Sequence, residues 1–197
     1  TDPDGVPASG ITYQWKADGT NISGATGATY TLTNAEVGKA ITVVANYTDS
    51  RSTAETVTSS ATSAVTNTND AGSIAISGTA TQGQTLSTTI TDPDGVPASG
   101  ITYQWKADGT DISGATSSTY TLTNAEVGKA ITVVANYTDS RSTAETVTSS
   151  ATSAVTNTND AGSIAITGTA TQGQTLTTNI TDPDGVPASG ITYQWKA

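Results

Sequence analysis

Apolar and polar residues alternate along several short runs in the middle of the chain. In the clearest run, Ile101, Tyr103 and Trp105 alternate with polar residues, so their side chains share one face of an extended segment. This period of two predicts β-strands that are buried on one side and solvated on the other. The strands predicted from this pattern cover residues 73–76, 85–90, 101–106, 119–123, 131–137 and 147–155.

Turn-forming residues separate these runs, and none of the runs has the period of a helix. Gln82-Gly83, Asp92-Pro93-Asp94-Gly95 and Asp108-Gly109 are typical turn sequences. Six or seven short strands within one such stretch predict an all-β fold, and specifically an antiparallel β-sandwich. The high threonine content agrees with this, because the branched Cβ of threonine suits strands and its hydroxyl tolerates water.

The same pattern predicts the core. We expect Trp105 to be buried between the two sheets. Ile131, Val133, Ala135 and Tyr137 should share a face, and the final strand should be long. The residues that we expect beside Trp105 are Leu122, Ile131 and Val133, and the final strand is marked by Val147, Ala151 and Val155.

The chain repeats itself with a period of 90 residues. The segment TDPDGVPASGITYQWKA occurs at 1–17, 91–107 and 181–197, and residues 1–90 match residues 91–180 at 84 positions. A period of this length corresponds to one small domain, so we predict a tandem array and expect these 197 residues to be a window on a longer one. The predicted domains are the C-terminal part of a repeat without its first two strands (1–70), one complete repeat (71–160) and the N-terminal part of the next (161–197).

Composition narrows the possible chemistry. Cysteine and histidine are absent, which excludes disulfides, thiol nucleophiles, Ser-His-Asp triads and the usual zinc and haem ligands. The formal charge of −10 argues against a nucleic-acid partner, and the apolar runs are too short to cross a membrane. We therefore expect neither an enzyme nor a membrane-inserted protein.

The run ITYQWKADGTDISGATSSTYTLTNAEVGKAITVVANYTDS, residues 101–140, resembles bacterial immunoglobulin-like domains, although it lacks their usual pair of cysteines. With the Asn-Asp linker and the Asp-x-Asp-Gly loop, the repeat is similar to the tandem immunoglobulin-like or cadherin-like repeats of large bacterial surface adhesins. This resemblance implies tandem immunoglobulin-like β-sandwiches at the cell surface, with neighbouring repeats of the same chain as partners.

Carboxylate and amide oxygens are the groups left for a binding site, and such hard ligands suit Ca²⁺. They cluster in the linker between repeats, in the Asp-Pro-Asp-Gly loop, and in the bend at Asp139 with Glu145 nearby. Strands that run up and down should bring these three places together at the junction between domains, and the resemblance to cadherin-like repeats implies calcium there. The predicted ligands are Asn69, Asp70, Asp92, Asp94 and Asp139, and then Asn159, Asp160, Asp182 and Asp184.

Two features of the sequence bear on the calcium hypothesis. Asp-Pro-Asp-Gly is also a good turn without any metal. The linker departs from the cadherin-like pattern because Ala71-Gly72 stands where a proline is usual.

Three functions fit these observations. The first is a structural extender, an adhesin stalk stiffened by Ca²⁺ at its junctions. The second is a self-assembling extracellular filament or matrix polymer in which other copies of the chain are partners. The third is a module that binds sugar or ice through an exposed face such as Thr119, Thr121 and Thr123.

Overall fold

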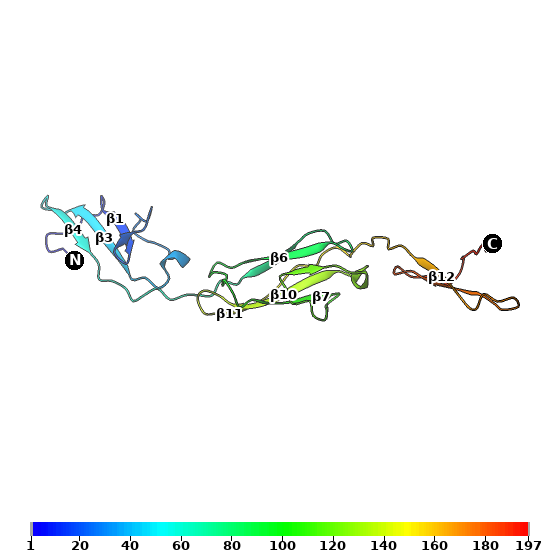
Figure 1. Ribbon diagram of the computed structural model, residues 1–197. Helices are drawn as coiled ribbons and strands as arrows, with labels where there is room; N and C mark the ends of the chain where they lie inside the picture. Colours follow the sequence, from blue (N-terminus) through cyan, green and yellow to red (C-terminus); the bar gives the residue numbers. More distant parts are fainter. Residues whose placement is uncertain (1, 197) are drawn as a thin grey trace. The chain divides into compact units, whose positions relative to one another are not determined.

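A computed structural model describes residues 2–196, and the protein is all-β (Figure 1). The chain divides into two compact units, Thr1–Ala71 and Gly72–Ala197. No helix in the described residues is long and apolar enough to span a membrane. The regular elements are short antiparallel strands and two single-turn 3₁₀ helices.

Within the second unit, residues 72–160 form two antiparallel sheets that lie in separate layers, with β6 on one side and β10 and β7 on the other (Figure 1). The first sheet has the order β11-β10-β7-β8, and the second has the order β5-β6-β9. The strands are β5 (Ser73–Ser77), β6 (Thr85–Thr91), β7 (Thr102–Ala107), β8 (Thr110–Asp111), β9 (Thr119–Thr121), β10 (Ile131–Thr138) and β11 (Ala144–Thr148). The 3₁₀ helix η2, Asn124–Glu126, follows β9.

The core lies between these sheets, and both sheets contribute to it. Trp105 is completely buried, as expected, and its indole N–H donates to the carbonyl of Ser117 at 2.8 Å. Leu86 and Ile74 approach from the second sheet and belong to the same cluster. The expected neighbours of Trp105 all belong to this cluster: Leu122, Ile131 and Val133. Alternation along β10 also gives the predicted face, because Ile131, Val133, Ala135 and Tyr137 are buried.

The prediction of a long final strand was wrong. Strand β11 ends at Thr148, Ala151 is exposed, and Val155 returns only as an isolated bridge to Val127. The backbone N–H of Ser149 reaches Val133, whereas that of Thr152 reaches Ile131, so three residues on one side match two on the other. The hydroxyls of Ser149 and Thr152 also accept the N–H groups of β10 at 3.0 Å, which replaces the regular ladder.

The first unit contains one four-stranded sheet of order β2-β1-β3-β4. Its elements are β1 (Thr12–Ala17), β2 (Thr20–Asn21), η1 (Asn34–Glu36), β3 (Ile41–Thr48) and β4 (Ala54–Thr58). The register of β1 on β3 is the same as that of β7 on β10, because Trp15 pairs with Val43 as Trp105 pairs with Val133. Leu32 is 46% exposed here, whereas its counterpart Leu122 is 2% exposed.

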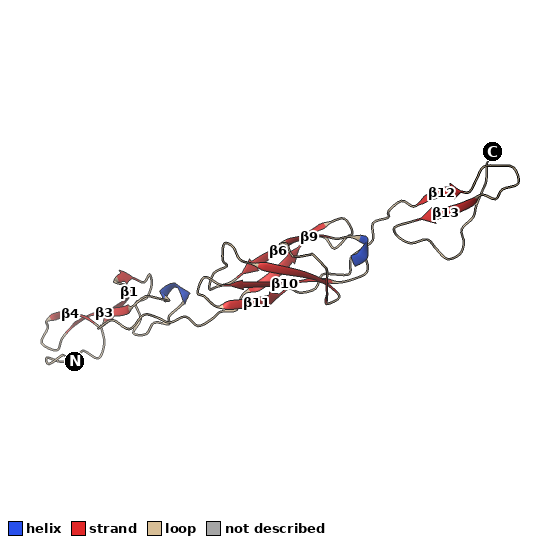
Figure 2. Ribbon diagram, turned by 60° about the horizontal axis from the view of Figure 1, so that its bottom comes forward, coloured by secondary structure: helices blue, strands red, loops and turns tan. Residues whose placement is uncertain are grey.

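The last elements of the second unit form a hairpin of β12 (Ser163–Thr167) and β13 (Thr177–Thr181), which pair only with each other (Figure 2). Strand β12 repeats the sequence positions of β5, and β13 repeats the last five positions of β6. Ile164 and Ile166 are each 62% exposed, whereas Ile74 is buried in the core of the preceding repeat.

Candidate metal centre

The Asp-Pro-Asp-Gly loop follows β6 and forms the predicted turn. One carboxylate oxygen of Asp92, Oδ1, accepts the backbone N–H of Asp94 at 2.8 Å, and the carbonyl of Asp92 accepts the N–H of Gly95 at 3.0 Å. These two bonds are typical of an aspartate that begins a turn. The second oxygen, Oδ2, accepts the hydroxyl of Tyr137 at 2.7 Å. The turn thus fixes the direction of the Asp92 carboxylate.

Asp139 follows β10 and organises the bend before β11. Its Oδ1 accepts the backbone N–H groups of Arg141 at 2.8 Å and Thr143 at 2.7 Å. Its own N–H donates to the carbonyl of Thr143 at 2.8 Å, which closes the bend. Asp139 is only 5% exposed, and its other oxygen, Oδ2, is buried without a hydrogen-bond partner.

A direct backbone contact holds the two loops together. The N–H of Ser140 donates to the carbonyl of Gly95 at 3.0 Å. Gly95 has a φ of +100°, and a Cβ at this position would lie 2.6 Å from the Ser140 hydroxyl. A larger residue is therefore disfavoured by the left-handed backbone conformation and would have to displace the Ser140 side chain.

The result is a group of three carboxylates, Asp92, Asp139 and Glu145, whose oxygens lie within 4.8 Å of one another. Glu145 joins the group because it lies opposite Tyr137 in the β10–β11 ladder, and it is 8% exposed. Three negative charges this close repel one another, and burial removes much of the water that would screen them. A divalent cation with oxygen ligands reverses the sign of this interaction, and Ca²⁺ fits the donor set.

The pKa of Tyr137 also responds to the negative charges of this group. Burial raises the pKa of its hydroxyl, and the hydrogen bond to Asp92 and the charges of Asp92, Glu145 and Asp139 raise it further. The neutral hydroxyl is the form that can donate to the carboxylate. Tyr137 thereby donates a hydrogen bond to Asp92 and adds no further negative charge to the group.

The chain that enters β5 passes directly over this group. A Cβ on Gly72 would lie 1.9 Å from the Tyr137 hydroxyl oxygen and 2.8 Å from Oδ2 of Asp92. Only glycine allows the backbone to come so close. The position after Ala71 must therefore be small enough to fit against Tyr137.

The first unit contains the same arrangement 90 residues earlier. Asp2, Asp49 and Glu55 place their oxygens within 4.8 Å of one another. The Tyr47 hydroxyl donates to Asp2 at 3.0 Å, and burial followed by this hydrogen bond raises the pKa of Tyr47. Oδ1 of Asp49 accepts two backbone N–H groups at 2.8 and 2.7 Å, as that of Asp139 does. Within residues 2–196, these two groups are the places where three or more side chains of this kind bring their ligand atoms within 4.8 Å of one another.

The other predicted ligands lie outside these groups. Asp94 is buried beside Asp92, but its oxygens do not complete the set of three. Asn69 and Asp70 are exposed and belong to the first unit, where Asp70 accepts a hydrogen bond from Asn34 at 3.0 Å. Their meeting with Asp92 stays a prediction.

At the second linker, Asp160 forms a hydrogen bond to the following Asp-Pro-Asp-Gly loop, and the predicted coordination of an ion there stays a prediction. The N–H of Asp160 donates to Oδ2 of Asp184 at 2.8 Å, and Asp184 in turn donates its N–H to Oδ1 of Asp182 at 2.9 Å. Asp160 also accepts a hydrogen bond from the Gln82 side chain at 2.5 Å. Asn159 is exposed. The linker and the following Asp-Pro-Asp-Gly loop thus meet through a hydrogen bond from a backbone N–H to a side-chain carboxylate.

Sequence reasoning placed Asp92 and Asp139 in the candidate site, but it left Glu145 outside the ligand set. It assigned Tyr137 only to the core and Gly72 only to the linker. The signal for Glu145 is its register: eight residues separate it from Tyr137 across a tight bend, so both lie on one rung of the ladder. Gly72 gives no such signal, because its role depends on a close approach that only the folded chain shows.

Comparison with protein-family models finds no match for this chain. Comparison with curated proteins gives no match either.

Proposed function

We propose that this chain is a structural extender, a segment of a long extracellular stalk built from tandem immunoglobulin-like domains and stiffened by Ca²⁺. The observation that carries the proposal is the recurrence of one partly buried carboxylate group at equivalent places, Asp2–Asp49–Glu55 and Asp92–Asp139–Glu145. A repeated structural site serves a repeated structural element. A catalytic site has no comparable reason to recur in each copy.

The strand arrangement supports the immunoglobulin-like part of the proposal. One sheet contains the strand with the buried Trp105 between β10 and β8, and the opposite sheet pairs β6 with both β5 and β9. Seven strands in two sheets around a buried tryptophan fit an immunoglobulin-like sandwich, although the fourth strand, β8, joins the sheet of β7 and not the opposite sheet as in the constant type. The absence of cysteine is compatible with this fold, because the core between the sheets is otherwise complete.

Calcium would restrain the position of the segment that enters β5. Asp92 and Asp139 belong to two different loops, Glu145 belongs to a strand, and Gly72 of the incoming segment lies against Asp92. An ion shared by these carboxylates ties the two loops to the sheet below the point where the chain enters. We propose that this restrains the hinge, and that Asn69 and Asp70 add oxygens from the linker.

The negative charge of the chain fits an extended array. Seven basic and seventeen acidic residues give neighbouring repeats the same sign, which keeps them soluble and apart. This agrees with a mechanical role outside the cell, with neighbouring repeats as the principal partners.

Melting of the full chain in Ca²⁺ and in chelator tests the proposal. Asp139→Asn removes one charge but keeps the oxygen that accepts from Arg141 and Thr143. In chelator this variant should be at least as stable as the parent, because repulsion within the group falls. In Ca²⁺ it should melt at a lower temperature than the parent, because a ligand is lost.

Asp111→Asn is the matched control, because it also removes one carboxylate and the equivalent residue of the first repeat is Asn21. It should show no such reversal. Small-angle scattering on the same samples tests the stalk, since Ca²⁺ should lengthen and stiffen the parent. A parent whose melting temperature and scattering ignore Ca²⁺ would refute the proposal.

A further inference from the structure

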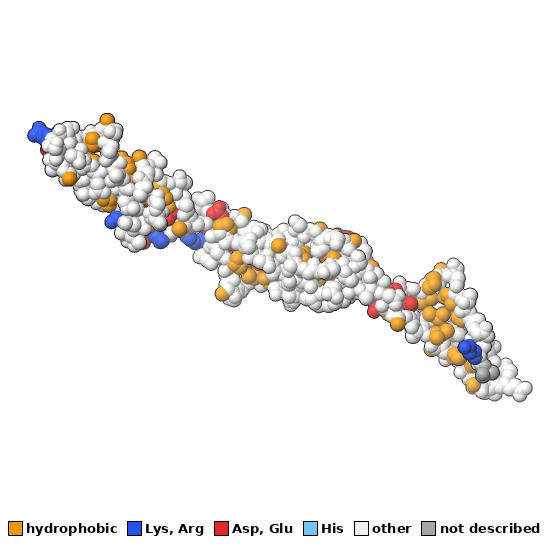
Figure 3. All heavy atoms as spheres, turned by 90° about the horizontal axis from the view of Figure 1, so that it is seen from above, with side chains coloured by type: hydrophobic (Ala, Val, Ile, Leu, Met, Phe, Trp, Pro, Cys, Tyr) orange, Lys and Arg blue, Asp and Glu red, His pale blue; other side chains and the backbone are white. Residues whose placement is uncertain are grey.

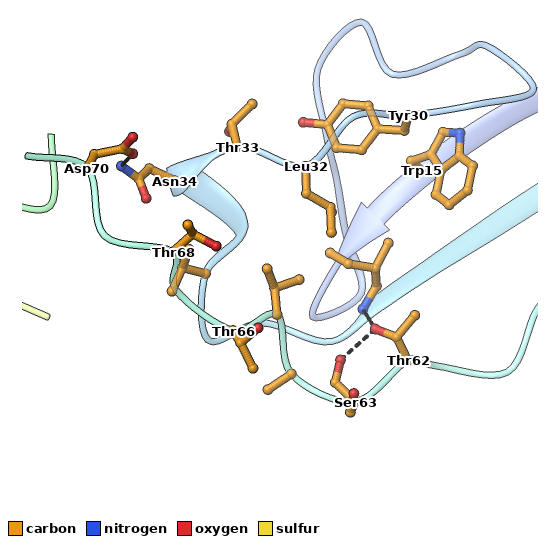
Figure 4. A pocket seen from close by; sticks show the side chains of 14 residues that line it. Trp15, Tyr30, Leu32, Thr33, Asn34, Thr62, Ser63, Thr66, Thr68 and Asp70 are labelled. Carbon is orange, nitrogen blue, oxygen red and sulfur yellow. Dashed lines mark hydrogen bonds between the residues drawn. The ribbon is translucent and has the colours of Figure 1, made fainter.

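Strand β5 forms one edge of its sheet, because it pairs with β6 and with no other strand in the part of the chain that the structure describes. A small hollow of about 200 Å³ lies along this edge, between residues 74–76 and 150–152. It is separate from the larger hollow of the first unit, which Trp15, Tyr30 and Leu32 line (Figure 4). An edge strand offers its outward backbone donors and acceptors to any strand that can lie beside it.

The hydrogen bonds of β6 show which groups of β5 point to the free edge. The N–H of Thr88 donates to the carbonyl of Ser118 on the side of β9, so the even-numbered residues of β6 face β9. Backbone groups alternate in direction along a strand, so the odd-numbered residues of β6 face β5, where they pair with its odd-numbered residues. The N–H and C=O groups of Ile74 and Ile76 therefore point away from β6. Within residues 2–196, neither isoleucine has a backbone-to-backbone hydrogen bond on that side.

The flank of the sandwich beside this edge is almost free of charge. Strand β5 has no charged residue, and residues 144–155, part of which lines the same hollow, contain only Glu145, which is 8% exposed. The outer face of the β5–β6–β9 sheet consists of serine, threonine and alanine. Figure 3 views the second unit from the side on which Figure 1 places β6, and charged side chains are sparse over the middle of residues 72–160 there. The negative charge that keeps copies of this chain apart elsewhere is missing here.

This edge also lacks the features that protect most sheet edges, which are lysine, proline, a bulge or a very short strand. The edge strands β8 and β9 are two and three residues long, and at β8 Asp111 forms an ion pair with Lys106. Strand β5 has five residues in unbroken register with β6, and none of them is lysine or proline. It is therefore open to pairing with another extended strand.

The sequence of β5 is the same in both directions. It is Ser-Ile-Ala-Ile-Ser, which is symmetric about Ala75. When two such strands pair antiparallel around a two-fold axis at Ala75, Ile74 of each copy lies opposite Ile76 of the other. The outward N–H and C=O groups of each such pair then form both of the hydrogen bonds that an antiparallel ladder allows. The edge is thus its own complement, as a two-fold interface requires.

We propose that β5 of one chain pairs antiparallel with β5 of a second copy, so that their β5–β6–β9 sheets join into one continuous sheet. The Ala75 residues of the two copies face each other at the centre, in a pair without mutual hydrogen bonds, where Cα atoms lie about 4.5 Å apart. The small side chain of alanine permits this approach. Sequence symmetry and the absence of charge both favour a second copy of the chain as the partner.

The repeat multiplies this contact. Ser163–Thr167 repeats the sequence of β5 with threonine in place of Ser77 and keeps the central Ile-Ala-Ile. One short pair of strands associates weakly, whereas equivalent strands spaced along two neighbouring chains strengthen each other. The proposal goes beyond the stalk, since it makes other copies lateral partners through a defined edge. It does not involve the carboxylate groups, and its test is run in chelator so that the two proposals can fail separately.

A single cysteine at the two-fold centre tests the proposal, because the chain has no cysteine of its own. Ala75→Cys places two thiols at a Cα separation that a disulfide can span. Ala75 is exposed, so the core is unchanged. Thr89→Cys is the matched control, because Thr89 is exposed on the same face opposite Ala75 but lies one strand away from the edge.

On non-reducing gels, the Ala75→Cys chain should form a disulfide-linked dimer on the order of ten-fold faster than the Thr89→Cys chain, because pairing raises the local concentration of the thiols. Equal rates would overturn the proposal.

Charge at the same positions gives a second test without a covalent bond. Sedimentation of the parent should show association that increases with concentration. Ala75→Lys combined with Ala165→Lys should abolish it, because like charges then face each other, and the corresponding pair of glutamate substitutions should do the same. Thr89→Lys with Asn179→Lys adds equal charge on the neighbouring strands and should leave the association intact.

Mixing the lysine variant with the glutamate variant should restore a complex, since opposite charges then face each other. A parent that is monomeric at all concentrations, association that survives the lysine substitutions at Ala75 and Ala165, or a mixture without a complex would overturn the proposal.

Discussion

Residues 1–70 and 91–160 have nearly the same sequence but different surroundings. They differ at three positions, Asn21/Asp111, Gly27/Ser117 and Ala28/Ser118. Leu122 is 2% exposed in the complete repeat, whereas Leu32 is 46% exposed in the first unit. The main sheet has the same order and register in both. The strands of this sheet therefore pair in the same way in both regions, whether or not the inner face is covered. Burial of that inner face requires the segment 71–90.

The largest effect should come from the tryptophans. Trp105→Ala should destabilise the complete repeat by about 3–5 kcal/mol, because it removes a fully buried side chain from the core. Trp15→Ala should cost clearly less, since Trp15 lines an open hollow. Urea unfolding of each variant, followed by circular dichroism, measures the two costs. Equal costs would mean that the two inner faces are equally covered.

Leucine truncation sharpens the same comparison. Leu86→Ala should cost about 2–5 kcal/mol, because Leu86 is fully buried between the sheets. Leu176→Ala, the same change in the hairpin β12–β13, should leave the stability of residues 71–160 unchanged. Hydrogen exchange of β10 amides at low protein concentration checks both variants. A loss of protection in the Leu176 variant would show that β12–β13 supports the complete repeat.

Much of this organisation follows from the sequence alone. Alternation predicted β5, β6, β7, β9 and β10 and the burial of Trp105. It failed after Thr148, where serine and threonine hydroxyls accept backbone N–H groups and three residues match two. Asp92 and Asp139 could be placed together because their loops share one end of the sandwich. Glu145 could not be assigned to the group without the exact pairing of β10 with β11. The role of Gly72 could not be predicted without the distance between its backbone and the Tyr137 hydroxyl.

Tyr137→Phe should have a smaller effect that depends on pH. At neutral pH it should cost about 1–2 kcal/mol, because the buried hydrogen bond to Asp92 is lost. Since the folded-state pKa of Tyr137 is raised, its contribution is fully present below the ordinary value of 10.0 and is lost as the pH rises above it. Unfolding between pH 7 and 11 should therefore show a steeper alkaline loss in the parent than in the variant. Parallel curves would show that Tyr137 does not sense the carboxylates.

The smallest effect should come from the 3₁₀ helix caps, which are equal in both copies. Oε2 of Glu126 accepts the backbone N–H and the hydroxyl of Thr123 at 2.9 and 2.7 Å, and Glu36 does the same with Thr33. Thr123→Ala should cost about 1 kcal/mol, within the usual range for loss of a cap. Thr33→Ala should cost a similar amount in the first unit. Thermal unfolding of the two variants gives both values, and a large difference would show that the caps depend on the covering segment.

Calcium titration calorimetry of the full chain tests the central claim most directly. Binding is expected at two groups, with dissociation constants of about 0.1–1 mM, as in extracellular modules. The pair of substitutions Asp49→Asn and Asp139→Asn should abolish the heat of binding, and Asp111→Asn should leave it intact. A parent that binds no Ca²⁺ in this range, or a double variant that binds as the parent does, would contradict the assignment of these carboxylates to a metal centre.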